Sequence, residues 1–281
     1  MASPPLVAEQ RIQTHPPSAI TLEFKNVFMS FDDKQVLDGI SFQLQHGETK
    51  AIFGVAGSGK STILKLALGL LKPDSGRIFV LGEEITGMPE SALFDLRRRV
   101  GIVFQESALF DSLTVRENVA FRLLEEGDVP EEQIEERVRE ALSFVELENT
   151  VNLYPSELSG GMRRRVAIAR TIITHPEVLL YDSPTGGLDP VTSNTIIELL
   201  VKQRDVYKTS ALLVTHRLQD AFTMATHYFD RAENKMKPLP PNARASVPLC
   251  FLILRDGHII FDGDLKSLRE TRDEYIREYI S

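Results

Sequence analysis

Residues 54–61 of this 281-residue chain read GVAGSGKS, and this stretch decides the fold. It matches the pattern G-x-x-x-x-G-K-[ST]. The apolar segment 49–53 before it predicts a buried strand, and the apolar residues of segment 61–71 after it, which stop at KPDSG, predict a helix. A strand, a glycine-rich turn and a helix in this order are the context that a phosphate-binding loop requires.

The loop supplies groups that suit a nucleoside triphosphate. Its glycines let the backbone curl, so that N–H groups and the start of the next helix face the phosphates. Lys60 is expected to bridge the β- and γ-phosphates and Ser61 to ligate Mg²⁺. The residues predicted to bind the nucleotide here are Gly54, Val55, Ala56, Gly57, Ser58, Gly59, Lys60, Ser61 and Thr62. The motif predicts ATP or GTP binding without choosing among kinases, GTPases and transport ATPases.

The rest of the chain alternates between strand-like and helix-like apolar patterns. Segments ITLEFKNV and ISFQL, within residues 20–45, predict a small, partly antiparallel sheet, and residues 130–147 show helical spacing. Continuous apolar runs at 178–181 and 210–215 predict buried strands, with a helix around 191–203 between them. Buried strands that alternate with helices indicate an α/β fold with a parallel sheet covered on both faces.

Composition excludes several classes of protein. The chain is 42% hydrophobic and 26% charged, as is ordinary for globular proteins, and no apolar run reaches the roughly 18–20 residues of a spanning helix. A net charge of -8 disfavours nucleic acid as a partner, and the arginine run 163–165 is expected to solvate a helix face or pair with acidic neighbours. The single cysteine, Cys250, lies in an apolar run and fits a packing role in a reducing cytoplasm.

Three segments fall outside the α/β pattern. Residues 1–19 are rich in proline and lack the apolar core of a signal peptide, which predicts a flexible leader. Residues 231–248 hold four prolines and are interpreted as an inserted surface loop, with contact to a partner protein as the alternative. Residues 265–281 are expected to form one amphipathic helix. The sequence does not decide whether this helix packs on its own domain or on another subunit.

Residues 158–162, LSGGM, open a second helical run, RRRVAIAR. Small residues and a hydroxyl at a helix start make an anion site. Together with the phosphate loop, this segment closely resembles the signature motif of the ABC ATPases. The resemblance implies that Ser159, Gly160 and Gly161 close over the γ-phosphate held by the other subunit. Taken in isolation, Ser159 would be an ordinary helix N-cap.

Further motifs follow in that family's order. Asp182 ends VLLYD, which resembles the Walker B strand, and the resemblance assigns it to Mg²⁺ through water. Gln105 in GIVFQES resembles the glutamine that senses the metal and couples to the permease. Asp189 in GLD resembles the D-loop at the dimer interface, and His216 in LLVTHR resembles the histidine that contacts the γ-phosphate.

The resemblance covers residues 20–264 and implies the fold of a P-loop NTPase. That fold has a RecA-like parallel-sheet core, an antiparallel β subdomain and an inserted α-helical subdomain, here at about residues 106–165. It also implies an ATPase that uses ATP and Mg²⁺, with Ser61, Gln105 and Asp182 around the metal. Phe31 is the expected aromatic side chain that stacks on adenine, with Phe28 as the alternative.

The resemblance implies partners as well. These are a second ATPase subunit, identical or different, and an integral membrane permease, which would hold the chain on the inner, cytoplasmic face of the plasma membrane. The stretch FQESALFDSLTVRENVAF and the methionine of LSGGM resemble the ATPases of the Mla and Mce transporters, which move phospholipids or other hydrophobic molecules between bacterial membranes. This narrower resemblance adds a substrate-binding Mce-type protein and a small accessory protein. ABC ATPases that act on nucleic acid carry long coiled coils or two such domains, which this sequence lacks.

Ser183 departs from the family's pattern. Most ABC ATPases carry a glutamate directly after the Walker B aspartate, where it orients and polarises the attacking water. Serine can hydrogen-bond that water but cannot take its proton at neutral pH, and loss of a positioned base costs about 10² to 10⁴ in rate. His216 or Glu106 could replace the base, which favours slow hydrolysis. Two alternatives are a degenerate subunit that only clamps ATP or pairs with a competent ATPase, and an engineered change that traps the ATP-bound dimer.

Overall fold

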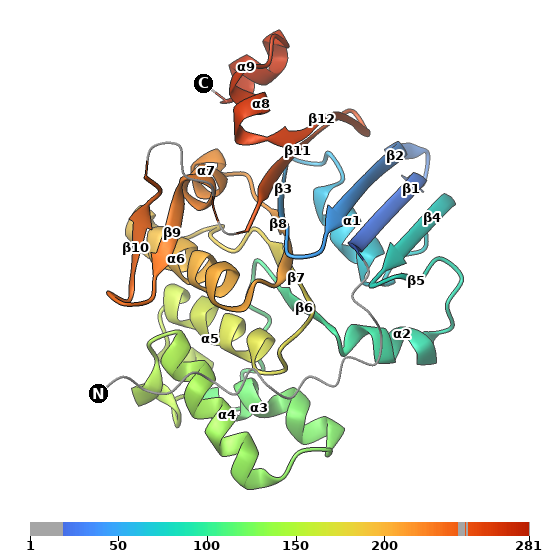
Figure 1. The fold of residues 1–281 in the computed structure, drawn as a ribbon. Helices are drawn as coiled ribbons and strands as arrows, with labels where there is room; N and C mark the ends of the chain where they lie inside the picture. Colours follow the sequence, from blue (N-terminus) through green and yellow to red (C-terminus); the bar gives the residue numbers. More distant parts are fainter. Residues whose placement is uncertain (1–18, 241–244, 246, 281) are drawn as a thin grey trace.

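A computed structural model describes residues 19–240, 245 and 247–280 of the chain (Figure 1). Within these residues the centre is a six-stranded sheet of order β12-β11-β3-β8-β7-β6. Its strands are β3 (Thr49–Gly54), β6 (Val100–Val103), β7 (Val178–Asp182), β8 (Ser210–Val214), β11 (Leu249–Arg255) and β12 (His258–Asp264). Within the described part of this sheet, the pairs from β11 to β6 are parallel and the β11–β12 pair is antiparallel. The parallel sheet expected for an α/β fold is confirmed.

A second, antiparallel sheet lies beside the first (Figure 1). Its strands are β1 (Ile20–Phe31), β2 (Lys34–Gln45), β4 (Ser75–Val80) and β5 (Glu83–Glu84) in the order β2-β1-β4-β5. Phe24 and Phe42 stack across the β1–β2 pair with ring centroids 4.8 Å apart. This sheet confirms the antiparallel pattern that the alternating apolar residues predict.

Helices cover both faces of the central sheet because its strands are apolar on both sides. Alternate residues of β3 enter two different cores: Ile52 packs with α1 (Lys60–Ala67), and Phe53 packs with α5 (Gly160–Ile172) and α6 (Pro190–Tyr207). The expected helix over residues 61–71 ends early, at Ala67. Gly69 adopts a left-handed φ of 64° there, and its N–H donates to the carbonyl of Leu66, which closes the helix.

A helical region separates β6 from α5 (Figure 1). Its helices are α3 (Val115–Glu126), α4 (Glu131–Phe144) and the 3₁₀ turns Glu148–Thr150 and Pro155–Glu157, and α2 (Glu90–Arg97) precedes β6. Thr114 and Glu117 form a reciprocal capping box at the start of α3. The buried residues of α4 include Ile134, Val138 and Ala141, at the spacing that predicted a helix.

Part of the loop expected at residues 231–248 is a strand. Strand β10 (Lys235–Pro238) pairs antiparallel with β9 (His227–Asp230), which follows α7 (Leu218–Thr226). Lys237 and Asp230 form an ion pair at 2.8 Å across this hairpin, and Met236 packs against the main core. Sequence periodicity missed the hairpin because strands of four residues are too short to show a period. The leader expected at residues 1–19 lies, apart from Ala19, outside the described residues.

The expected single C-terminal helix is two short helices, α8 (Leu265–Arg269) and α9 (Glu274–Ile280). Asp264 caps the first by accepting from the N–H of Ser267, and Asp273 accepts from the N–H of Ile276 in the second. Side-chain caps of this kind compete with continuation of a preceding helix. No helix in the described part of the chain is both long and apolar enough to cross a membrane.

Phe251 offers a test of this core. Its side chain is fully buried on β11, with ring centroids 6.0 Å from Phe53 and 5.7 Å from Phe222. Phe251→Ala is expected to lower the free energy of unfolding in urea by about 3–5 kcal/mol, because it leaves a cavity between the sheet and α7. Phe94→Ala, at a side chain that is 56% exposed, is the control and should change it by less than about 0.5 kcal/mol. Equal losses in both variants would contradict this account of the core.

Candidate functional site

The predicted motifs meet at one edge of the central sheet. Four neighbouring strands, β3, β8, β7 and β6, run parallel, so their carboxyl ends lie together. The phosphate loop follows β3, His216 follows β8, Asp182 ends β7 and Gln105 follows β6. Ligand sites of parallel α/β sheets lie in this position, outside the carboxyl ends of the strands.

Glycine is required in the loop by close contacts as well as by backbone angles. Gly54 has φ 154°, and a Cβ there would lie 2.5 Å from Ser58 Oγ and 2.6 Å from the carbonyl oxygen of Leu254. Gly59 has φ 95°, and a Cβ there would lie 2.6 Å from Leu37 Cδ2. The loop therefore curls tightly between β1–β2 and β11, as the sequence motif predicts.

Lys60 is held inside the loop that precedes it. Its ammonium donates to the carbonyl oxygens of Gly54 and Val55, both at 2.8 Å, and to Ser58 Oγ at 3.3 Å. The side chain is buried, and this burial lowers the pKa of Lys60 while Asp182 acts in the opposite direction. The arrangement places a positive charge at the centre of the curled backbone.

Ser61 and Asp182 form a pair that could hold a hard metal ion. Ser61 Oγ lies 3.2 Å from Asp182 Oδ1, across the gap between α1 and the end of β7. A hydroxyl and a carboxylate oxygen are ligands that Mg²⁺ accepts, with the other positions left for water and phosphate oxygens. No group of three or more His, Cys, Asp or Glu side chains suited to a metal occurs among the described residues.

Ser183 sits in an unusual backbone conformation next to this pair. Its φ is 46°, its N–H donates to the carbonyl of Val214 at 2.8 Å, and its side chain is 3% exposed. Ser183 Oγ is buried without a hydrogen-bond partner. A buried hydroxyl in this state can donate to a water or to a phosphate oxygen.

His216 and Gln105 are two further candidates that follow strands of the central sheet. Burial is the larger cause that lowers the pKa of His216, the charge of Lys60 adds to it, and Asp182 opposes both. This lowered pKa favours the neutral imidazole, which can accept a hydrogen bond. The side chain of Gln105 lies against Gly186, where an added Cβ would be 3.3 Å from its amide carbon.

The signature residues form a second group at the start of α5. Ser159 Oγ accepts from the N–H of Met162 at 3.2 Å, so it caps the helix. Gly161 packs so closely on α6 that a Cβ would lie 2.3 Å from Thr192 Cγ2. Asp189 caps α6 by accepting from the N–H groups of Val191 and Thr192, both at 3.0 Å. The interpretation of Ser159 as an N-cap and its interpretation as part of an anion site are thus compatible.

Two aromatic side chains were considered for stacking on a base. Phe31 is 43% exposed at the end of β1. Phe28 is partly buried, and its ring lies against Gly39, where an added Cβ would be 3.1 Å away. Phe31 therefore has the more accessible ring face.

Sequence reasoning missed three side chains at this edge. Tyr279 of α9 lies beneath the phosphate loop, and the N–H of Gly54 donates to its hydroxyl at 3.2 Å. Arg164 was expected on a solvated face but is 4% exposed, and Asp220 of α7 is 3% exposed. A helical-spacing signal for Arg164 existed, because it precedes the buried Ala167 and Ile168 by three and four residues.

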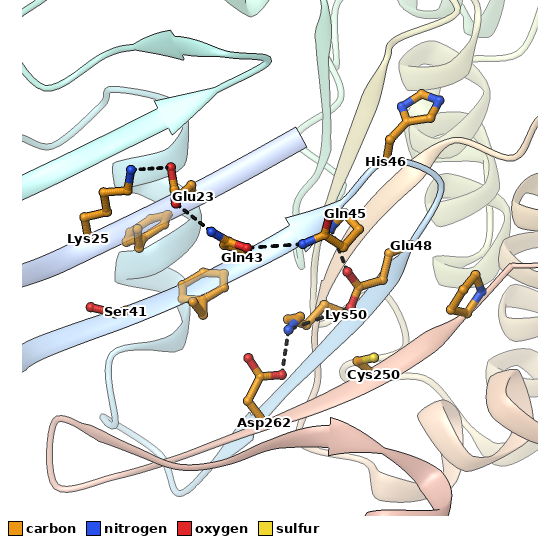
Figure 2. Close-up of a pocket in the computed structure, with 13 residues that line it drawn as sticks. Glu23, Lys25, Ser41, Gln43, Gln45, His46, Glu48, Lys50, Cys250 and Asp262 are labelled. Atoms are coloured by element: carbon orange, nitrogen blue, oxygen red, sulfur yellow. Dashed lines mark hydrogen bonds and ion pairs between the residues drawn. The ribbon is translucent and has the colours of Figure 1, made fainter. Parts of the chain in front are cut away.

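A hollow of about 630 Å³ lies elsewhere, between the β1–β2 sheet and the neighbouring strands β3, β11 and β12 (Figure 2). Several of its polar side chains are paired with one another. Gln43 donates to Glu23 at 2.6 Å, and Lys50 donates to Asp262 at 2.6 Å. We place the functional site at the converging loops rather than here, because the motif residues do not line this hollow.

Comparisons with known proteins point to one family. Residues 37–186 match the family model described as "ABC transporter". A dimeric bacterial ABC transporter cassette superposes with a TM-score of 0.73 and 29% identity, over 87% of this chain and 98% of that chain. The same cassette bound to ADP and phosphate gives a TM-score of 0.72. The cassette cbiO1 of Clostridium perfringens, part of the transporter complex cbiONQ, gives 0.75 at 28% identity, over 93% of this chain and 94% of that chain.

Curated relatives have several names. Protein TRIGALACTOSYLDIACYLGLYCEROL 3, chloroplastic, of Arabidopsis thaliana is 44% identical over 93% of this chain and 74% of its own length. The intermembrane phospholipid transport system ATP-binding protein MlaF of Haemophilus influenzae is 34% identical over 76% of this chain and 81% of its own length. The methionine import ATP-binding protein MetN of Carboxydothermus hydrogenoformans is 40% identical over 69% of this chain, a match that spans 58% of that protein.

Cys250 provides a chemical test of the hollow. Burial, and then the neighbouring carboxylate of Glu48, raise the pKa of the Cys250 thiol to about 12. The thiol should therefore stay protonated at pH 8 and react with iodoacetamide at least about 100-fold more slowly in the folded chain than in urea. Because Cys250 is the single cysteine, labelling of the whole chain reports on it, and Cys250→Ser gives the blank. Equal labelling rates in the folded and the urea-unfolded chain would contradict the burial of the Cys250 thiol.

Proposed function

The chain belongs to the ABC transporter family as an ATP-binding subunit, and from that premise we propose the roles of its site residues, its partners and its substrate. It is an ATPase with the P-loop NTPase fold, and its cofactors are ATP and Mg²⁺. The observation that carries the proposed roles is the convergence of the loops that hold Lys60, Asp182, His216 and Gln105 at the carboxyl ends of adjacent parallel strands.

We propose that the phosphate loop, residues 54–61 with Thr62, binds the triphosphate through its N–H groups, while Phe31 stacks on adenine. Lys60 then exchanges its loop carbonyls for β- and γ-phosphate oxygens. Mg²⁺, when bound, neutralises charge that develops on the phosphates. Ser61, Asp182 and Gln105 are the residues proposed to hold it, directly or through water.

The proposed catalytic residues are Lys60, Gln105, Asp182, Ser183 and His216. Ser183 would orient the attacking water through its unpartnered hydroxyl, and the neutral imidazole of His216 would contact the γ-phosphate and replace the missing base. Glu106, next to Gln105, is the second candidate for that base. The expected result is slow hydrolysis, because serine cannot accept the proton of the water.

The second group of residues is proposed to act on another subunit. Ser159, Gly160 and Gly161 would close over the γ-phosphate of a paired ATPase subunit, with Asp189 at the same interface. This proposal is supported by the helix start that they form and by the dimeric state of a similar cassette. The partner would be a second copy or a competent ATPase.

The proposed membrane partner is a separate permease. Exposed apolar side chains of α2, α3 and the segment between Gln105 and α3 suit such a contact: Phe94 is 56%, Phe110 42% and Leu124 39% exposed. The permease would hold the chain on the inner face of the plasma membrane, or of the membrane that it occupies, since the Arabidopsis relative is named as chloroplastic. The Mce-type protein and the accessory protein belong to this proposal.

We propose phospholipid, or another hydrophobic molecule, as the transported substrate. The support is the resemblance of residues 104–121 to lipid-transporter ATPases, the intermembrane phospholipid transport named for the relative MlaF, and the diacylglycerol lipid in the name of the Arabidopsis relative. The MetN names favour methionine as the alternative. A second candidate function, an ATP-gated clamp without turnover, is favoured by Ser183 alone.

Phosphate release from Mg·ATP tests the proposed roles. Lys60→Ala is expected to abolish turnover, whereas Lys65→Ala, on the exposed face of the same helix, should leave it unchanged. Ser183→Glu is expected to raise the turnover number by about 10² or more, because a carboxylate can take the proton of the water. Ser91→Glu, at an exposed serine of α2, is the matched control.

The two outcomes separate the candidate functions. Turnover that needs Lys60 and rises in Ser183→Glu supports an ATPase limited by its missing base. Tight ATP binding without turnover in every variant and complex would instead support the ATP-gated clamp.

Substrate can be tested in the complex of the chain with its permease. Reconstituted in phospholipid vesicles, the complex should hydrolyse ATP faster than in lipid-free detergent, and added methionine should have no effect. Stimulation by methionine in place of phospholipid would favour the MetN-like alternative. Lys60→Ala in the same complex gives the background rate.

A further inference from the structure

Two buried charges hold the loop after β7 from different sides. On one side, Arg164 of α5 donates through Nη1 to the carbonyl of Ser183 at 3.5 Å and through Nη2 to that of Gly186 at 3.4 Å. On the other side, Asp220 of α7 accepts a short hydrogen bond from Thr185 Oγ1. Ser183, Thr185 and Gly186 of this loop are thus bonded to Arg164 or Asp220, and no sequence motif assigned a role to either of these two side chains.

Arg164 also reaches the loop of Gln105. Its Nη1 donates to the carbonyl of Phe104 at 2.9 Å, which is a stronger contact than the two on the β7 loop. Since Phe104 directly precedes Gln105 and Arg164 belongs to the signature helix, one guanidinium joins three of the motif segments.

The surroundings of Arg164 are unusual for a buried cation. No ion pair to it occurs in the described part of the chain; its partners are backbone carbonyls, its Nε is unpartnered, and Glu106 acts on it only at longer range. A buried charge without a close counter-ion costs stability. Such groups concentrate at functional sites, where the cost is balanced by positioning of the reacting groups.

Asp220 links the loop after β7 to the turn that contains His216. Its Oδ2 lies 3.3 Å from the hydroxyl of Thr215, the residue before His216, and its Oδ1 lies 3.4 Å from Arg217. Arg217 in turn donates to Ser193 Oγ of α6 at 2.9 Å. The carboxylate therefore ties the β7 loop to the β8 turn, and through Arg217 to the helix that Asp189 caps.

We propose that Arg164 and Asp220 are positioning residues for ATP hydrolysis, which act together by fixing the loop 183–186 against the loops of Gln105 and His216. The inference rests on the proposed roles of Gln105, Ser183 and His216. The loop is held in place through its carbonyl dipoles and the hydroxyl of Thr185, which suits the left-handed backbone of Ser183. A shift of the Gln105 loop would pull Arg164, and hence the loop 183–186, out of position.

A purely structural role makes a different prediction. Buried charges that only stabilise the fold would, when changed, lower stability and all site functions in parallel. Positioning residues would lower the turnover number while ATP affinity and stability change little, because displacement by about 1 Å can cost 10²-fold in rate. Arg165 is the matched control, since it lies on the same helix but donates to the carbonyls of Val145 and Glu146, away from the site.

The experiment compares Arg164→Lys and Asp220→Asn with Arg165→Lys and Asp230→Asn. For the first two we expect kcat to fall about 10- to 100-fold, KM to change less than about threefold, and the unfolding midpoint to stay near that of the parent. The double variant Arg164→Lys/Asp220→Asn should lose little more than the worse single variant, because residues that act as a unit are not additive. The two control variants should keep the kcat of the parent.

A second measurement does not depend on turnover. Amide hydrogen exchange of residues 183–188 should accelerate in Arg164→Lys and Asp220→Asn, and not in Arg165→Lys. Unchanged exchange, or equal losses of kcat, affinity and stability in the Arg164 and Arg165 variants, would overturn the inference. A parent without Lys60-dependent turnover would instead refute the proposed function, and exchange would then still decide whether the two charges hold the loop.

Discussion

The parallel pairing of β3 with β8 and β11 is the constraint on which the site depends. It buries every residue of β3 and brings the carboxyl ends of β3, β8, β7 and β6 to one edge of the sheet. The loops at that edge have no such pairing of their own, so glycine contacts, caps and buried charges hold them. The sheet fixes the position at which each loop begins, and side-chain hydrogen bonds fix the path of the loop beyond it.

Much of the fold was predictable because its signals are local. The strand, glycine-rich turn and helix of residues 49–67 follow from one motif, and the buried runs of β7 and β8 are visible as continuous apolar stretches. The predictions that were wrong concern elements that depend on contacts between distant residues or on a single helix cap. The β9–β10 hairpin is defined by cross-strand pairing of short segments, and Asp273 at the start of α9 divides a helix that amphipathic spacing alone would continue.

The site divides in the same way. Lys60, Ser61, Asp182 and His216 were named from motifs, and the structure brings them to one edge of the sheet, although their roles stay proposals. Arg164 and Asp220 could not be named from motifs, because what distinguishes them is burial beside carbonyls and hydroxyls that lie up to 60 residues away in sequence. Sequence motifs identify the side chains that would contact the nucleotide. They do not identify the side chains that hold the surrounding loops in place.

The position of β11 has a consequence for how the chain forms during synthesis. β11 (Leu249–Arg255) lies between β12 and β3 and pairs with residues translated about 200 positions earlier. Until β11 emerges from the ribosome, β3 keeps one unpaired edge of apolar residues, and such edges invite pairing with other chains. The nascent protein is therefore expected to require chaperone protection until β11 emerges, and a chain that stops before Leu249 should aggregate rather than form a partly active cassette.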